Sequence, residues 1–201
     1  AGNNVGLRLA MIDPRCAFFW CLNADAIPET SAWTKLIKEC GGQSLPIVAG
    51  SVLLNYDLPE TIQTAGSRFS KATLLVSFLH ANQPIALLDG LPEKLPVGYP
   101  SGASLMLNRA YIEEHGYFDA SYFLYYEEPD LVVRLKEASQ CFVCTRSRVY
   151  HKGGQTTGGG GSVLDRSSRA DYEYNRSRII LAKKLGGWAI LLSMLVSMVS
   201  I

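Results

Sequence analysis

The residues best suited to chemistry are three carboxylates, Glu127, Glu128 and Asp130, which lie close together in the stretch YFLYYEEPDLVVRL. Pro129 stands among them, and proline is favoured in the first turn of a helix, where its missing N–H costs nothing. The acids are therefore predicted to crowd the beginning of a helix, whose free N–H groups stabilise ionised carboxylates while mutual repulsion raises the pKa of one of them. Such a group suits a general base, with Glu128 first, Asp130 as its support and Glu127 as the cap. Ordinary capping is the alternative.

A second candidate, Asp25, follows the apolar run CAFFWCL at 16–22. A continuous apolar run of strand length is typical of a strand buried on both faces, as in a parallel sheet covered by helices. Asn23 and Asp25 come directly after it, and polar residues at the carboxyl end of such a strand lie where open α/β sheets bind ligands. Asp25 is therefore a candidate site residue by its position.

The third candidate, His151, ends the segment VYH and is followed by the glycine-rich stretch GGQTTGGGGS. We expect this stretch to be a loop that orders over a bound group, and a plain linker is the alternative. Imidazole and carboxylate ligands for a divalent cation, together with a carboxylate base, are what transfer of a group from a diphosphate carrier requires. The alternative to metal binding is a structural role, which is common for a lone histidine after a strand.

The periodicity of the chain predicts an α/β fold that would position these residues. A strand at 16–22, a helix ended by Gly41 and Gly42, and a strand at 46–54 indicate a βαβ unit and a mostly parallel sheet. Gly102 is expected to allow close approach of the backbone. The remaining predicted elements are a helix at 5–11, a strand at 101–107, a helix at 109–115 capped by Gly116, a helix from Pro129 that buries Leu131, Leu135 and Ala138, a strand at 141–146 and a helix at 166–185.

The amino-acid composition limits the classes of protein to which this chain could belong. A chain of 201 residues with 48% hydrophobic and 18% charged residues is typical of one globular domain, and the net charge of +1 argues against a nucleic-acid partner. The five cysteines are odd in number and unevenly spaced, which favours a reducing compartment over a disulfide framework. Cys141 and Cys144 are expected to be core thiols, because residues three apart on a strand face opposite sides; redox or metal use is the alternative.

Three segments carry weaker signals. Residues 55–100 are punctuated by proline and glycine, which predicts a loop-rich region available for substrate or acceptor contacts. The helix at 166–185 concentrates basic residues, among which Arg176 is a candidate phosphate contact, although most such residues are simply solvated. The tail at 188–201, WAILLSMLVSMVSI, is too short to span a bilayer and predicts an in-plane membrane helix or the cut-off start of a transmembrane segment. A core or oligomer helix is the alternative.

The order of these motifs resembles the family 2 glycosyltransferases of the GT-A (Rossmann-like) fold, in particular their rhamnosyltransferase-like branch. The pieces that carry the resemblance are AGNNVGLRLA, FFWCLNADAIP, SGASLMLNRAYIEEHGYFDASYFLYYEEPDLVVRL, VYHKGG and YNRSRIIL. The resemblance covers most of the chain, with residues 1–185 as a partial GT-A domain and 186–201 as an apolar, membrane-associated tail. The family's nucleotide-binding units are expected upstream of Gly2.

The resemblance also implies roles for individual residues. Asn23 and Asp25 occupy the DxD-like position of the family, where Asp25 and His151 would hold Mg²⁺ or Mn²⁺ against the donor diphosphate. Glu128 matches the catalytic base of the family, although the family usually has Asp at this position. Because of this difference, Glu127 or Asp130 could share the role. The further predicted donor contacts are Gly102 and Arg176.

The implied activity is an inverting, metal-dependent transfer of a sugar from a nucleotide-diphosphate donor to a glycan or lipid-linked acceptor. It would serve cell-surface polysaccharide synthesis in the cytoplasm, peripherally at the inner face of the cell membrane. Two alternatives stay open: a truncated, non-catalytic domain that binds glycan or partner chains, and a metal-dependent nucleotidyltransferase or phosphohydrolase.

Overall fold

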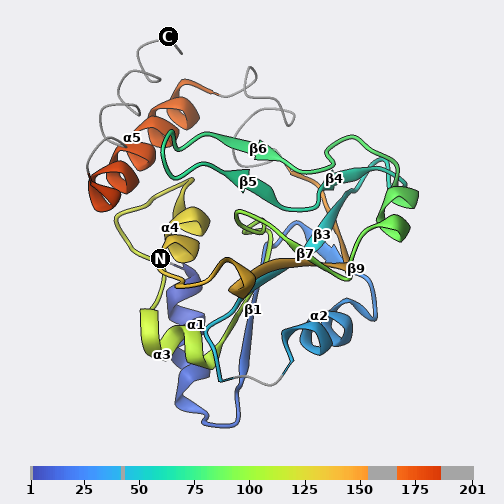
Figure 1. Cartoon of the computed structure of the whole chain (residues 1–201), viewed down its shortest axis with the longest axis horizontal. Coiled ribbons are helices and arrows are strands. Elements are labelled where there is room, and N and C mark those ends of the chain that lie inside the picture. The colour runs from blue at the N-terminus through green and yellow to red at the C-terminus, as the bar shows by residue number, and fades with distance from the viewer. Residues whose placement is uncertain (1, 42–43, 154–166, 187–201) are drawn as a thin grey trace.

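The computed structural model describes residues 2–41, 44–153 and 167–186 (Figure 1). Its helices and short 3-10 segments are α1 (Gly2–Ile12), α2 (Ala32–Cys40), η1 (Ile85–Gly90), α3 (Arg109–His115), α4 (Glu127–Val133), η2 (Ala138–Gln140) and α5 (Ser168–Leu185). Its strands are β1 (Phe18–Leu22), β2 (Ala26–Pro28), β3 (Val48–Asn55), β4 (Ile62–Thr64), β5 (Ser67–Phe69), β6 (Val76–Phe78), β7 (Lys94–Pro96), β8 (Ser104–Asn108) and β9 (Cys141–His151).

The main sheet is mixed rather than mostly parallel. Its strands follow the order β1-β8-β3-β9-β2, with β4 added to β3 and β7 added to β9. Among the described strands, β3 and β9 form the one parallel pair, and every other pairing is antiparallel. The prediction of a mostly parallel sheet is therefore wrong for this part of the chain, because an apolar run reports burial on both faces and carries no information on the direction of its neighbours.

The predicted crossover through α2 is present in a modified form. Strands β1 and β3 both pair antiparallel with β8, so they run in the same direction with β8 between them. This intervening strand comes from much later in the chain, and local pattern could not place it there.

Side chains alternate between two helical layers on opposite faces of the sheet. Leu105 and Leu107 of β8 pack with α1, α3 and α4, whereas Met106 between them packs with α2. Figure 1 shows α2 on the other side of the sheet from α1 and α3. The period of two along a strand produces this division, which buries β3 and β8 on both faces. β1, for which the sequence predicts the same burial, is instead an edge strand in which only Phe19 is fully buried.

The two cysteines of β9 confirm the same alternation. Cys141 packs with the α1, α3 and α4 layer and Cys144 with the α2 layer, and both are buried. All five cysteines lie within the described residues and are free thiols. The prediction of core thiols is confirmed.

The helix signals are confirmed to different extents. α3 has the predicted bounds, because Asn108 accepts a hydrogen bond from the N–H of Tyr111 and Gly116 ends the helix with φ of +77°. α4 is shorter than predicted and ends at Val133. Leu131 and Leu135 are buried, but Ala138 is exposed at the beginning of η2, where the chain already turns toward β9.

Residues 55–100 hold more structure than the predicted loop-rich region. β4 and β7 extend the main sheet, and β5 and β6 form a separate hairpin. α5 lies beside this hairpin in Figure 1, and its Leu181 and Ala182 pack with Leu74 and Tyr126 in one buried cluster. The helix thereby joins the hairpin to the segment that precedes α4.

Two predicted features lie outside the described residues. They are most of the glycine-rich stretch, at 154–166, and the apolar tail at 187–201. Within the described part of the chain, no helix combines the length and the hydrophobicity needed to cross a membrane.

Candidate active site

The turn before β8 brings two of the predicted site segments together. The N–H of Gly102 donates a 3.0 Å hydrogen bond to Oε1 of Glu128, and the carbonyl of Ala103 accepts a 3.1 Å hydrogen bond from the N–H of Asn23. Consecutive Cα atoms are about 3.8 Å apart. The turn that carries Asn23 and Asp25 and the beginning of α4 therefore meet on adjacent residues of one backbone segment.

Asp25 and His151 lie side by side at the end of β9. Ala26 of β2 pairs with His151, and the N–H of Lys152 donates a 3.2 Å hydrogen bond to the carbonyl of Asp25. Oδ1 of Asp25 lies 3.4 Å from Nε2 of His151, and both side chains are largely buried. The two residues predicted to hold a metal are thus neighbours, although most of the chain separates them in sequence.

This pair fits a divalent cation that also binds phosphate. Carboxylate oxygen and imidazole nitrogen are both metal ligands, and burial lowers the pKa of His151, against the opposing effect of Asp25, which favours the neutral ring that coordinates metals. Among the described residues, no cluster of three or more His, Cys, Asp or Glu side chains could hold a metal by itself. Mg²⁺ is typically held by one or two carboxylates, with its other positions left to water and substrate phosphate, and Asp25 would supply such a carboxylate here.

A third residue, Gln63 of β4, contacts this pair and was not among the residues predicted from the sequence. Its Oε1 lies 2.7 Å from Nδ1 of His151, and its Nε2 donates a 3.3 Å hydrogen bond to the carbonyl of His151. Gln63 stands in the region predicted to be loop-rich, and only the pairing of β4 with β3 places it here. No local signal marks it.

The acidic residues of α4 stand at the beginning of the helix, as predicted, but the cap differs. Tyr126 is the N-cap residue and Glu127 the first helical residue, and within the described part of the chain no side chain caps the helix. Tyr125 and Tyr126 have φ of 65° and 66°, a left-handed conformation that is strained for bulky residues. The prediction that Glu127 caps the helix is wrong, because the tyrosine backbone occupies that position.

Aromatic packing holds these two tyrosines in place. The hydroxyl of Tyr126 donates a 2.8 Å hydrogen bond to the carbonyl of Leu74, and its ring centroid lies 5.1 Å from that of Tyr174 on α5. The ring of Tyr125 packs edge-on against the same tyrosine at 5.6 Å. The surrounding structure therefore fixes the direction in which α4 begins, and with it the position of Glu127 and Glu128.

The two glutamates share an environment that favours their neutral forms. Burial, reinforced by the charge of Glu127, raises the pKa of Glu128 to about 8, while the N–H of Gly102 opposes the shift. Burial also raises the pKa of Glu127, and its Oε2 is buried with no hydrogen-bond partner among the described residues. The pair consequently retains a proton at neutral pH, which is the behaviour of a general base poised near its working pH.

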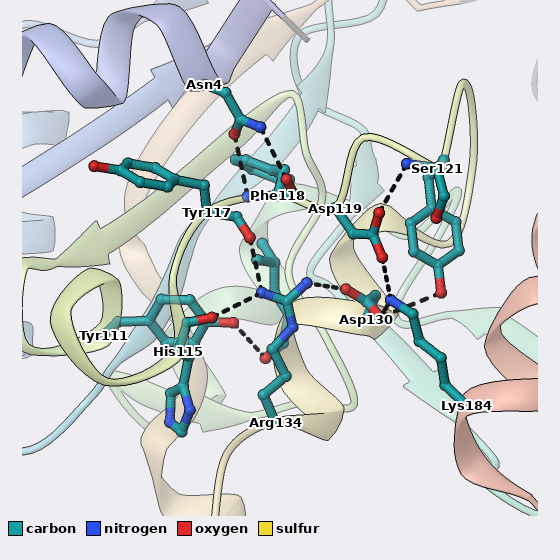
Figure 2. A network of polar contacts seen from close by, with 12 residues as sticks. Asn4, Tyr111, His115, Tyr117, Phe118, Asp119, Ser121, Asp130, Arg134 and Lys184 are labelled. Atoms are coloured by element: carbon teal, nitrogen blue, oxygen red, sulfur yellow. Dashed lines mark hydrogen bonds and ion pairs between the residues drawn. The ribbon is translucent and has the colours of Figure 1, made fainter.

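Asp130 occupies a different environment from the other two acids (Figure 2). Its side chain is buried, forms an ion pair with Arg134 and accepts hydrogen bonds from Nζ of Lys184 at 2.5 Å and from the hydroxyl of Tyr122 at 3.2 Å. Lys184 also binds Asp119 at 2.6 Å. These contacts occupy the Asp130 carboxylate and join α4 to α5, so its placement favours a structural role over support of the base.

The remaining predicted donor contacts are Asn23, Arg176 and Gly102. Asn23 is exposed in the turn between β1 and β2. Arg176 donates a 3.1 Å hydrogen bond to the carbonyl of Ser121 and lies 3.4 Å from Oε2 of Glu173, which anchors α5 to the segment before α4. Gly102 contacts Glu128, and its lack of a side chain leaves room for the Glu128 carboxylate.

Comparison with known proteins places this geometry in context. No protein-family model matches the chain. A stretch of 98 residues, 48% of the chain, is 34% identical to the N-acetylglucosaminyl-diphospho-decaprenol L-rhamnosyltransferase of Mycobacterium tuberculosis, in both strain CDC 1551 / Oshkosh and strain ATCC 25618 / H37Rv. The matched stretch spans 30% of the length of these relatives. The predicted resemblance to rhamnosyltransferase-like glycosyltransferases is therefore confirmed over about half of the chain.

Proposed function

We propose that this chain carries the metal-binding and catalytic side of a glycosyltransferase active site that moves a sugar from a nucleotide-diphosphate donor to a lipid-linked or glycan acceptor. The observation that carries the proposal is the meeting of the Asn23–Asp25 turn and Glu128 on the adjacent residues Gly102 and Ala103. A diphosphate leaving group and an acceptor hydroxyl must react within one small volume, and this arrangement supplies a group for each.

Asp25 and His151 are proposed to hold the cation. A Mg²⁺ or Mn²⁺ ion held there would offset the negative charge of the departing nucleoside diphosphate. The support for this step is the pair of ligand atoms 3.4 Å apart at the end of β9, together with the neutral state of the His151 ring that its lowered pKa favours.

Glu128 is proposed to accept the proton of the acceptor hydroxyl as that oxygen attacks the anomeric carbon. A direct, inverting displacement of this kind needs one base, unlike glycoside hydrolysis with its two carboxyl groups. Glu127 stands next to Glu128 and raises its pKa, which makes the ionised base stronger once it has lost its proton. Asp130 takes no part in the proton transfer, because Arg134 and Lys184 hold it.

The names of the relatives support a proposal for the donor and the acceptor. Those enzymes transfer L-rhamnose and are named for an acceptor linked through diphosphate to decaprenol. We propose that this chain likewise transfers rhamnose to an acceptor linked to a polyprenyl diphosphate. A lipid-linked acceptor fits a peripheral position at the cytoplasmic face of the membrane, to which residues 188–201 would contribute.

Release of nucleoside diphosphate from a nucleotide-diphosphate rhamnose, with Mn²⁺ and a polyprenyl-diphosphate sugar, tests the proposal in the full chain. Glu128→Gln and Asp25→Asn are expected to lower the rate at least a hundredfold, because the first removes the base and the second a ligand charge. The matched controls Glu60→Gln and Asp57→Asn change exposed residues and keep the wild-type rate. Wild-type rates in both site variants would overturn the assignment, and turnover without any acceptor would indicate a hydrolase.

A further inference from the structure

One side chain, that of Gln63, makes two contacts with one residue, His151. The amide Nε2 donates to the backbone carbonyl of His151 at 3.3 Å, and the amide Oε1 lies 2.7 Å from ring atom Nδ1. The backbone of Gly153, with φ of +64°, approaches the same amide so closely that a Cβ there would lie 3.0 Å from Nε2. The amide is therefore enclosed between the ring of His151 and the chain that follows it.

The first contact fixes the orientation of the amide. A side-chain amide nitrogen only donates and its oxygen only accepts, so the nitrogen must face the carbonyl of His151. A flipped amide would set two oxygen atoms against each other at that carbonyl. Oε1 consequently faces Nδ1, and the short Nδ1–Oε1 contact is a hydrogen bond only when Nδ1 carries a hydrogen.

The second ring nitrogen then has an equally defined state. In the neutral ring a hydrogen on Nδ1 leaves Nε2 with a lone pair. That lone pair points to Oδ1 of Asp25 at 3.4 Å, so two acceptor atoms face each other. Two acceptors at this separation repel one another unless a cation or a proton lies between them.

We propose that Gln63 is a positioning residue that holds His151 in the Nδ1–H tautomer, so that Nε2 is presented beside Asp25 to a divalent cation. The proposal rests on the metal site of the proposed function and adds the residue that prepares it. Metal-binding histidines generally donate their other ring N–H to a fixed acceptor, and here a side-chain amide from β4 takes that part. The competing arrangement is a doubly protonated His151 that forms a plain ion pair with Asp25.

Nitrogen NMR of the metal-free chain labelled with ¹⁵N-histidine distinguishes the two arrangements at pH 8.5. The expected spectrum shows His151 with a protonated Nδ1 and an unprotonated Nε2, and His151→Asn identifies its signals. In Gln63→Leu the acceptor at Nδ1 is lost, so the hydrogen is expected to move to Nε2, where Asp25 accepts it. Gln63→Glu keeps an acceptor at Nδ1 and is expected to retain the wild-type tautomer.

Two spectra would overturn the proposal: a wild-type His151 protonated at Nε2, or a tautomer that is the same in Gln63→Leu as in the wild type. His80 and His115 provide internal references, since both should keep their signals in every variant. Thermal unfolding of each variant identifies any that fails to fold, in which case Gln63→Asn, with its shorter amide, replaces Gln63→Leu.

Binding of Mn²⁺, measured by electron paramagnetic resonance without donor or acceptor, separates this inference from the proposed function. Gln63→Leu is expected to weaken binding about tenfold to a hundredfold, the usual cost of removing a partner of a metal-bound histidine. The matched control Gln83→Leu, at an exposed residue, should bind as the wild type does. Binding lost in Asp25→Ala but unchanged in Gln63→Leu overturns the role of Gln63 and leaves the metal site standing. A wild-type chain that binds no Mn²⁺ overturns both.

Discussion

The N–H of Gly102 donates a hydrogen bond to Oε1 of Glu128, and the carboxylate lies so close that residue 102 has no room for a Cβ atom. A Cβ built on residue 102 would lie 3.1 Å from Cδ of Glu128 and closer still to Oε1. Gly102 is thus required here by the approach of a carboxylate, which gives its predicted role in close backbone approach a specific partner.

Gly102→Ala is expected to displace Glu128 and to lower the rate of transfer roughly a hundredfold, since a shift of about 1 Å in a catalytic group has an effect of that order. The KM for the donor should change little, because Asp25 and His151 stay in place. Gly90→Ala is the matched control, because nothing lies within 4 Å of a Cβ at that position. Equal rates for the two variants would show that Glu128 is not the base.

The rate of transfer is expected to rise with pH up to about 8 and then level off. Burial and the neighbouring Glu127 raise the pKa of Glu128 to about 8, so the ionised base is the minor form at neutral pH. A pH profile of kcat/KM checks this expectation. Glu127→Gln removes one cause of the shift and should move the profile to lower pH, whereas an unchanged profile would assign the titration to another group.

Glu128→Gln is expected to stabilise the protein above pH 5. The pKa of Glu128 is raised from 4.5 in the unfolded chain to about 8 in the fold, so between these values the folded state holds more protons than the unfolded state. The free energy of unfolding of the wild type therefore falls as pH rises through this window, and the glutamine variant escapes the loss. The gain at pH 8.5 should amount to a few kcal/mol, since one pKa unit corresponds to about 1.4 kcal/mol. Urea unfolding of both proteins at pH 4.5 and pH 8.5 measures it.

Removal of one partner from the Asp130 cluster is expected to destabilise the protein more than it affects the chemistry. Asp130→Asn leaves Arg134 and Lys184 facing a neutral group, and breaking a buried ion pair in this way costs roughly 3–5 kcal/mol. Lys184→Met should cost less, because the lysine side chain is 38% exposed. Thermal unfolding and the rate at low temperature are the two measurements.

Lys183→Met provides the control for this cluster, because Lys183 is exposed beside Lys184 on the same turn of α5. We expect its stability to match that of the wild type. If the Asp130→Asn protein keeps the stability of the wild type but loses transferase activity, Asp130 takes part in catalysis.

The sequence alone determined the features that local chemistry controls. Asn108 and Gly116 bound α3 at the predicted residues, since a cap and a positive φ depend on neighbours within one turn. The acids gather at the beginning of α4 for the same reason, and the polar residues after β1 follow from where its apolar run ends. Family resemblance then joined Asp25, Glu128 and His151 into one hypothesis.

Only the tertiary structure decided what depends on distant segments. The antiparallel insertion of β8 between β1 and β3 makes the sheet mixed, and apolar runs cannot specify such a neighbour. Gln63 reaches His151 because β4 pairs with β3, and Lys184 of α5 withdraws Asp130 from the acidic cluster. Hydrogen bonds and ion pairs between segments far apart in the chain leave no periodic trace in the sequence, so the partners of each candidate residue emerge only when the chain is folded.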